Sequence, residues 1–244
     1  MAEIRTEGLS VSYPLKKHVS VPALDHLSLT FPDGSFSVLL GPSGSGKSTL
    51  LKAILGLIPY EGTIYLDDDD LSLYSFGERR FAYVSQEIVL QPSATVFDNI
   101  AYPLRIQGMD KATILEKVYA LAKEFDLTDC LSRKPKQISL GQAQRTAMAR
   151  AIIKNASVYL FDEPFSNLDA PHRDEERHYL QKAMRNLHAT VIYVTHSVPE
   201  ATALADQINV LDHGKLVWQG LPDALASSSL PLLQELVKSD DPLL

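Results

Sequence analysis

Cysteine and long hydrophobic runs are almost absent from this chain. Its 244 residues include a single cysteine, Cys130, which excludes a disulfide within the chain and fits a reducing compartment. The longest apolar runs, such as FSVLL at 36–40 and VIYV at 191–194, are far shorter than the roughly 20 residues that cross a bilayer. The opening residues MAEIRTEGLS also lack the apolar stretch of a signal peptide. We therefore expect a cytoplasmic protein that meets a membrane only through a partner.

An excess of positive charge is also lacking. The chain has 23 Lys and Arg against 30 Asp and Glu, a formal net charge of -7, and no local basic stripe stands out. Because a phosphodiester backbone attracts basic surfaces, nucleic acid is not expected as a partner. Four consecutive aspartates at 67–70 are interpreted as a solvated turn at a strand end, with a metal cluster as the alternative.

Short apolar runs rich in strand-forming residues alternate with helical segments. These runs are residues 36–40, 81–85, 158–161, 191–195 and 208–212. Such alternation predicts an α/β domain with a mostly parallel sheet. With 45% hydrophobic residues, a chain of this length can bury one sizeable core.

Two parts of the chain depart from this alternation. The first 34 residues and TIYLD at 63–67 place strands close together with tight turns, which predicts an antiparallel β portion. Residues 90 to about 156 contain no convincing strand, and Asp110 is placed as the N-cap of a helix in that segment. Apolar residues on one face of this helix are Ile114, Leu115, Val118, Leu121, Ala122 and Phe125. A helical insert is therefore expected.

These patterns predict a division of the chain into three parts. The core, with its antiparallel portion, comprises residues 1–88 and 157–220. A helical subdomain occupies 89–156. A short helical tail, which begins after Gly220, occupies 221–244.

The segment GPSGSGKS at 41–48 matches G-x-x-x-x-G-K-[ST], follows the predicted strand 36–40 and opens an amphipathic run. Its glycines let successive N–H groups converge, and the helix start adds partial positive charge for phosphate oxygens. Lys47 is expected to reach the β- and γ-phosphates of a nucleoside triphosphate, and Ser48 to offer its hydroxyl to Mg²⁺. The predicted phosphate-binding residues are Gly41, Pro42, Ser43, Gly44, Ser45, Gly46, Lys47, Ser48 and Thr49. The alternative, a plain Gly-rich turn, leaves the flanking strand and helix unexplained.

Two further strand ends carry the residues that hydrolysis requires. The apolar residues 158–161 deliver Asp162 to the carboxyl edge of the sheet, where Mg²⁺ is expected, and Glu163 follows as the predicted general base. His196 follows the strand 191–195 and is predicted to hydrogen-bond the γ-phosphate and fix the attacking water, with a structural role as the alternative.

Gln86 and Tyr13 are weaker candidates. Gln86 ends the run FAYVSQ, and its amide oxygen is expected to complete the Mg²⁺ and water shell; a polar strand cap is the alternative. Tyr13 precedes the phosphate loop and is predicted to stack on the nucleotide base, with an ordinary buried tyrosine as the alternative.

Taken in order, these motifs resemble the ATP-binding subunit of an ATP-binding cassette (ABC) transporter. The resemblance covers roughly residues 3 to 220 and rests on Tyr13, GPSGSGKST, Gln86, ISLGQAQR at 138–145, VYLFDEP at 158–164, SNLD at 166–169 and His196. It implies a P-loop ATPase core that binds ATP and Mg²⁺. In that family the Ser/Gly helix start of ISLGQAQR is the signature motif, which binds the γ-phosphate of ATP held by a second subunit.

The chemistry of the signature segment agrees with that implication. Ser139 and Gly141, followed by Gln142, offer a hydroxyl and a close backbone N–H at a helix start, an anion site without a lysine or metal ligands of its own. Such an anion site needs a second subunit to supply the lysine and the metal ligands. A homodimer with two composite ATP sites is therefore expected. The resemblance places Asp169 across that interface, near the opposite Glu163.

The chain departs from the family pattern at two positions. Leu140 stands where the signature motif usually has its first glycine, which adds bulk and removes backbone freedom at the interface. Ser197 stands after His196, where an acidic residue is often found.

The resemblance is strongest to bacterial importer ATPases of the sugar, polyamine, sulfonate and iron type. The segment 85–108 has apolar and aromatic residues that are expected to form a groove for a membrane subunit; they are Val89, Leu90, Val96, Phe97 and Tyr102, and packing inside the helical lobe is the alternative. The implied partners are transmembrane permease subunits and an extracytoplasmic solute-binding protein, with this chain at the cytoplasmic face of the membrane. The 24 residues after Gly220 are too few for the extra β domain of many sugar importers.

Three other classes of protein are alternatives. A separate-chain exporter ATPase remains open. A soluble ABC ATPase of translation or DNA repair is less favoured, because tandem cassettes, a coiled-coil insert or basic extensions are missing from this sequence. A P-loop kinase or GTPase leaves ISLGQAQR unexplained.

Overall fold

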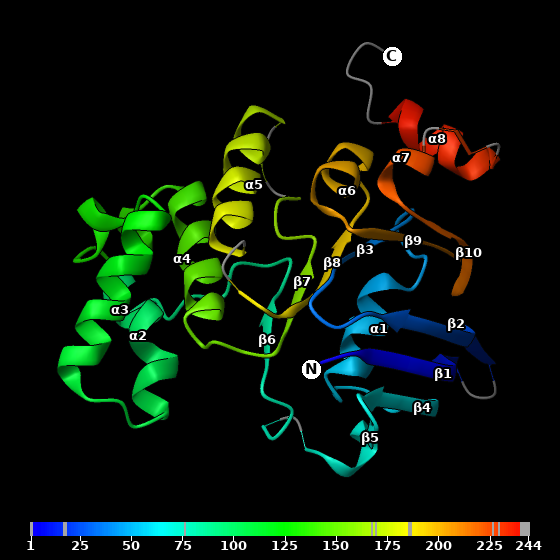
Figure 1. Cartoon of the computed structure of the whole chain (residues 1–244), viewed down its shortest axis with the longest axis horizontal. Coiled ribbons are helices and arrows are strands. Elements are labelled where there is room, and N and C mark those ends of the chain that lie inside the picture. The colour runs from blue at the N-terminus through cyan, green and yellow to red at the C-terminus, as the bar shows by residue number, and fades with distance from the viewer. Residues whose placement is uncertain are drawn as a thin grey trace. The chain divides into compact units, whose positions relative to one another are not determined.

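A computed structural model of the chain describes residues 2–16, 19–75, 77–166, 168, 170–184, 187–225, 227–228 and 230–239 (Figure 1). The chain folds as two compact units. The first comprises residues 1–81 and 189–244, and the second comprises residues 82–188. The segment predicted as a helical subdomain, 89–156, lies inside the second unit, and the three-part division remains a prediction.

An antiparallel sheet forms one part of the first unit, in the strand order β2-β1-β4-β5. Its strands are β1 Ile4–Lys16, β2 Val19–Phe31, β4 Glu61–Leu66 and β5 Asp69–Asp70. Ile4 lies opposite Phe31 on one side and Leu66 on the other. Buried residues alternate along β1, as expected for a sheet with one face on the core. The predicted antiparallel β portion is thus confirmed.

Parallel strands form the other part of the first unit. β3 Phe36–Leu40 pairs in parallel with β8 Thr190–Thr195 and with β9 Gln207–Asp212, and β10 Lys215–Gly220 pairs antiparallel with β9. Every residue of β8 is buried, which explains its continuous apolar sequence. This unit also contains helices α1 Lys47–Ile54, α6 Val198–Leu204, α7 Pro222–Leu225 and α8 Pro231–Ser239, and the 3₁₀ turn η1 Leu71–Leu73. The predicted α/β fold class is confirmed.

The second unit is mainly helical. Two strands, β6 Phe81–Val84 and β7 Val158–Asp162, are neighbours in a sheet. The helices are α2 Val96–Ile106, α3 Lys111–Glu124, α4 Leu140–Ile152 and α5 Ala170–Met184, with 3₁₀ turns η2 Thr128–Cys130 and η3 Pro135–Gln137. Helices α2 and α4 pack against each other, as Figure 1 shows.

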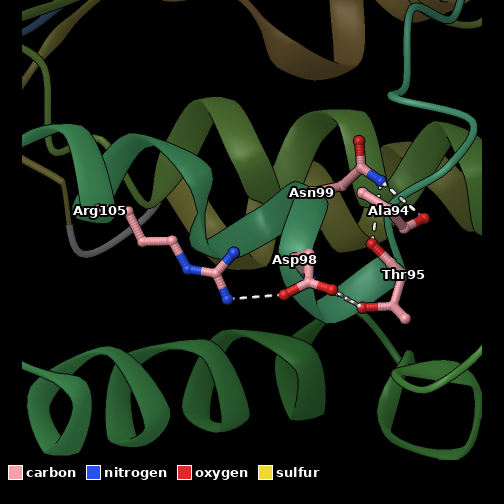
Figure 2. Close-up of polar contacts among 5 residues, drawn as sticks. All are labelled: Ala94, Thr95, Asp98, Asn99 and Arg105. Atoms are coloured by element: carbon pink, nitrogen blue, oxygen red, sulfur yellow. Dashed lines mark hydrogen bonds and ion pairs between the residues drawn. The ribbon is translucent and has the colours of Figure 1, made fainter.

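The start of α2 is fixed by side-chain hydrogen bonds (Figure 2). Thr95 caps the helix: its Oγ1 accepts from the Asp98 N–H at 3.1 Å and donates to the Asp98 carboxylate at 2.7 Å. The Asn99 amide, which is 2% exposed, donates to the carbonyl oxygens of Thr95 at 2.9 Å and Gln91 at 3.2 Å. The Thr95 hydroxyl, and then the Arg105 guanidinium, lower the pKa of Asp98. These contacts anchor the segment that connects Gln86 to α2.

The predicted helix at Asp110 is confirmed, with one error about its buried face. The Asp110 carboxylate accepts from the N–H groups of Ala112 and Thr113, both at 3.0 Å. Ile114, Val118, Ala122 and Phe125 are buried. The prediction that Leu115 shares the buried face was wrong: Leu115 is 52% exposed although it lies only about 20° around the helix from the buried Ala122, so periodicity alone does not decide its burial.

Three of the four aspartates at 67–70 accept hydrogen bonds in the turn after β4 and in β5. Asp67 accepts from the Glu3 N–H at 3.0 Å, Asp70 caps η1 by accepting from the Ser72 N–H at 2.8 Å, and Asp69 accepts from the Tyr74 hydroxyl at 3.2 Å. Each of these carboxylates therefore has a local structural partner.

The helices are short for a membrane-crossing role. The longest of those described, α5, has 15 residues, against the roughly 20 that span a bilayer. Within the described parts of the chain, the helices fall short of the length and apolar character that membrane crossing requires.

Candidate functional site

The phosphate loop, residues 41–49, follows β3 and passes close to neighbouring backbone. Gly41 has φ 155°, and a Cβ atom there would lie 2.2 Å from the Leu211 carbonyl oxygen. Gly46 has φ 103°, and a Cβ atom there would lie 2.4 Å from the Ala23 carbonyl oxygen. Both positions combine an unusual backbone angle with a lack of space, so only glycine fits them.

The Lys47 side chain holds the loop in shape from inside. Its Nζ donates to the carbonyl oxygens of Gly41 at 2.7 Å and Pro42 at 2.8 Å, and the residue is 4% exposed. Helix α1 begins at Lys47 with Gly46 as its N-cap, which provides no side-chain hydrogen bond. The start of a helix carries a partial positive charge, which favours an anion such as a phosphate.

His196 and Tyr13 lie in the same unit as the loop. Because Leu40 of β3 pairs with Thr195 of β8, the loop and His196 leave adjacent strands at the same edge of the sheet. Tyr13 is 41% exposed, and its hydroxyl lies 3.5 Å from the Thr49 Oγ1. The alternative of a buried tyrosine is therefore wrong, and the ring is accessible for stacking.

The sequence did not predict a hydrogen bond that supports the phosphate loop from a neighbouring turn, which we call the brace. The turn between β9 and β10 meets the loop where the Gly214 N–H donates to the Ser45 carbonyl oxygen at 3.0 Å. The Gly214 carbonyl oxygen in turn accepts from the Asp25 N–H at 3.1 Å. The tripeptide DHG at 212–214 signals a hairpin turn, but nothing in the sequence indicates which surface that turn contacts.

Asp162 and Glu163 lie at the end of β7 in the second unit. Asp162 is 4% exposed and accepts from the Tyr83 hydroxyl at 3.2 Å. Burial, reinforced by the Asp162 charge, raises the pKa of Tyr83, so this hydroxyl stays a donor. Glu163 has φ 44°, a left-handed angle that is strained for a side chain of this size, and its carbonyl oxygen accepts from the Ser166 N–H at 3.2 Å. Such strain is found at functional sites.

The residues predicted to hold Mg²⁺ belong to different units. Ser48 is in the first unit, and Gln86 and Asp162 are in the second. Gln86 is exposed and lies two residues beyond the end of β6. These three side chains offer a hydroxyl, an amide oxygen and a carboxylate, the oxygen donors that Mg²⁺ prefers together with substrate phosphates. The donor chemistry therefore fits the ion.

The signature segment opens α4 with a reciprocal pair of hydrogen bonds. The Ser139 Oγ accepts from the Gln142 N–H at 3.2 Å, and the Gln142 Oε1 accepts from the Ser139 N–H at 3.1 Å, which forms a capping box. The N–H groups of Leu140 and Gly141 lie in the first turn, where the helix itself supplies no acceptor. The structure thus presents a hydroxyl and backbone amides at one helix start.

Ser197 and Asp169 are the remaining positions that the sequence singled out. Ser197 is the N-cap of α6, and its Oγ accepts from the Glu200 N–H at 3.4 Å. Since serine and aspartate are both preferred at N-caps, this explains how serine replaces the usual acidic residue. Asp169 lies outside the described residues.

A buried lysine at the start of a helix, which a glycine-rich loop connects to a parallel strand, defines the class: this is a P-loop nucleotide-binding protein. A family model described as "ABC transporter" matches residues 24–166. The chain belongs to the ABC transporter family, which confirms the resemblance drawn from the motifs.

Similar proteins include importer subunits. The chain is 41% identical over 226 residues to an sn-glycerol-3-phosphate import ATP-binding protein of Jannaschia sp. (strain CCS1), covering 92% of this chain and 64% of that protein. It is 43% identical over 210 residues to the trehalose/maltose import ATP-binding protein of Thermococcus litoralis, covering 83% and 56%. The chain thus spans less than two thirds of the length of these relatives.

A solved structure shares the fold. It is the dimeric, post-hydrolysis state of the ATP-binding cassette MJ0796 bound to ADP and Pi, with a TM-score of 0.80 and 27% identity. The match covers 90% of this chain and 98% of that one.

Proposed function

We propose that this chain is the ATP-binding and ATP-hydrolysing subunit of an ABC importer. The observation that carries the proposal is the start of α4, where Ser139 and the first-turn amides offer an anion site that has no lysine of its own. A second anion site of this kind is explained if it binds ATP held by the phosphate loop of another copy.

Nucleotide binding follows from the residues of the first unit. The loop amides and the start of α1 surround the phosphates, and Lys47 adds positive charge while it keeps the loop closed through Gly41 and Pro42. Tyr13, exposed beside Thr49, stacks on the base.

Hydrolysis is assigned to residues at the strand ends. Glu163 accepts the proton of the attacking water, and His196 hydrogen-bonds the γ-phosphate and orients that water. Ser48, Gln86 and Asp162 are the residues that would hold Mg²⁺, and the ion would neutralise charge on the phosphates. Tyr83 keeps the Asp162 carboxylate oriented through its hydroxyl.

A homodimer completes two such sites. Each ATP is held between the phosphate loop of one protomer and Ser139, Gly141 and neighbouring groups of the other. We place Asp169 at the same interface. Loss of the γ-phosphate removes the anion that both protomers share, so hydrolysis opens the dimer.

The direction of transport is inferred from the names of the relatives, and the membrane partners are inferred from exposed apolar residues. The names of both curated relatives specify import. Val89 and Tyr102, within the segment predicted to meet a membrane subunit, are 62% and 53% exposed, whereas Val96 is fully buried and was wrongly predicted there. The exposed residues provide the contact for permease subunits at the cytoplasmic face of the membrane, and an extracytoplasmic solute-binding protein delivers the solute.

The experiment is ATP-dependent dimerisation of the Glu163→Gln protein. Glutamine keeps the size of the side chain but accepts no proton, so MgATP is expected to trap a stable dimer with hydrolysis reduced by about a hundredfold or more. Analytical ultracentrifugation measures the dimer and phosphate release measures turnover. Adding Lys47→Ala is expected to abolish dimerisation by removing tight nucleotide binding. A monomer at every MgATP concentration, or turnover at the wild-type rate, contradicts the proposal.

A further inference from the structure

A buried carboxyl group lies directly beside the signature helix start. Glu176, on α5, is 3% exposed, and its Oε1 lies 2.9 Å from the point where a Cβ atom on Gly141 would stand. Ser139, Gly141 and Glu176 line one cavity of about 570 Å³. A glycine at position 141 therefore leaves room for this carboxyl group and for a ligand to approach the backbone closely.

Arg145 connects the carboxyl group to α4. Its Nε lies 3.4 Å from the Glu176 Oε1, and its Nη1 lies 3.6 Å from the Asp126 Oδ2. The guanidinium also stacks over the Tyr179 ring, 4.8 Å from the ring centroid. Both Arg145 and Glu176 are more than nine-tenths buried. The first turns of α4 are thus tied to the middle of α5 through one pair of side chains.

The pair is incompletely satisfied. In the parts of the chain that the structure describes, the Glu176 Oε2 and the Arg145 Nε are buried and have no hydrogen-bond partner. A carboxylate without hydrogen-bond donors is costly to bury, whereas a neutral carboxyl group is much less so. Burial therefore favours the protonated form, and the ion pair with Arg145 opposes it.

The charged and titratable groups that face Glu176 come from three segments. They are Arg145 on α4, Asp126 after α3, and His172, Glu175 and Tyr179 on α5. Burial raises the pKa of Glu176 to about 7; Arg145 and, more weakly, His172 act to lower it, and Glu175 acts to raise it. The side chain therefore changes its charge near neutral pH.

We propose that Glu176 is a positioning residue of the signature site: its neutral carboxyl group, with Arg145, holds the Gly141 helix start for the partner's γ-phosphate, and its carboxylate form repels that phosphate. The inference rests on the proposed function, in which two protomers share each ATP. Two negative charges in one cavity disfavour each other. Binding of ATP between the two protomers therefore favours protonation of Glu176, and protonation of Glu176 favours that binding by linkage. Closure of the dimer is then accompanied by proton uptake at this residue.

The test measures the dimer dissociation constant of the Glu163→Gln protein with MgATP, from about pH 6 to about pH 8.5. In this range the native carboxyl group becomes charged, so the constant is expected to rise about tenfold with pH. Glu176→Gln keeps the neutral form at every pH, and its constant is expected to change less than about threefold. ATP itself titrates in the same range, so the inference concerns the difference between the two proteins.

Matched controls separate this role from a general loss of structure. Glu175→Gln makes the same chemical change one residue earlier and is expected to keep the pH dependence with a lower midpoint, because the Glu175 charge raises the pKa of Glu176. Binding of MgADP to the monomer is expected to stay within about twofold in Glu176→Gln, because the phosphate loop belongs to the other unit. Glu176→Leu supplies a second neutral side chain if the glutamine variant does not fold.

The outcomes are distinct. If the parent Glu163→Gln protein never dimerises with MgATP, the proposed function fails and this inference falls with it. If the parent dimerises and the pH dependence is the same in Glu176→Gln or Glu176→Leu, the inference alone is overturned. A pH dependence that is lost only in the Glu176 variants, with MgADP binding intact, supports it.

Discussion

Leu140 occupies the first position of α4 with 51% of its side chain exposed. Ser139 and Gln142 form the capping box on either side of it, so the leucine leaves the helix start intact and adds apolar surface at the expected dimer interface. In the proposed dimer, the departure from the usual glycine therefore changes the surface that a partner protomer would contact, and it leaves the capping box in place.

Leu140→Gly is expected to keep or raise the ATPase rate, because bulk is removed where the partner approaches. The same change should lower the free energy of unfolding by about 1 kcal/mol, since glycine is a poor helix former. Steady-state phosphate release and urea denaturation measure the two effects. Leu140→Ala, which removes bulk without that helix cost, is the control. A collapse of turnover in both variants would show that the leucine is required.

The positions of the residues assigned to the proposed nucleotide site were predictable because these residues follow strand ends. Strand β7 ends at Asp162, directly before Glu163, and β8 ends directly before His196. Strand β3 ends at Leu40, directly before the phosphate loop that contains Lys47. The sequence contained no comparable signal for Glu176: it lies in the charged run RDEER of α5, and its burial depends on Arg145, which is distant in sequence. The strained φ of Glu163 was likewise unpredictable from its residue type.

At the scale of elements, the turn between β9 and β10 is the least expected support of the site. Gly214 has φ 76°, and a Cβ atom there would lie 2.8 Å from the Ala23 carbonyl oxygen. Any side chain at this position displaces the turn and with it the hydrogen bond to the Ser45 carbonyl oxygen. The brace therefore couples the outer hairpin to the shape of the phosphate loop.

Gly214→Ala is expected to weaken MgADP binding about tenfold, which corresponds to about 1.4 kcal/mol, because the loop loses its brace. Gly34→Ala is the matched control: Gly34 also has a positive φ, 68°, but a Cβ atom there meets nothing within 4 Å. The control should lose about 1 kcal/mol of folding stability and keep its affinity. Isothermal titration calorimetry measures the binding, and equal affinity in the two variants would remove the brace from the site.

Secondary structure was predicted well where the pattern was strong, and packing was predicted less well. All five apolar runs form strands, and Asp110 caps its helix. Leu115 and Val96 show where the reasoning failed: periodicity identifies an apolar face, but the width of the buried stripe is set by neighbouring elements. Leu115 faces outward, and Val96 is enclosed at the start of α2.

At the scale of the whole molecule, the proposal requires a membrane partner. Tyr102, on α2, lies in the segment predicted to contact a permease and is half exposed. Leu115, on α3, is exposed to a similar extent and lies outside that segment.

Copurification from membranes tests this requirement. The tagged wild-type chain is expected to bring down membrane-spanning permease subunits, identified by mass spectrometry. Tyr102→Glu should lose them, because a charge replaces an aromatic contact, while MgADP binding remains. Leu115→Glu should retain them. Equal loss in both variants, or a tagged chain that brings down no membrane protein, would count against the predicted contact.

The closed capping box at Ser139 has a consequence for how two copies meet. Both hydrogen bonds between Ser139 and Gln142 exist within a single chain, so this helix start is already shaped before any encounter. Association on that surface then loses rotational and translational entropy but requires little further ordering of the backbone or side chains. Such preorganised surfaces dock as rigid bodies, which favours rapid and reversible cycles of engagement over slow folding on contact.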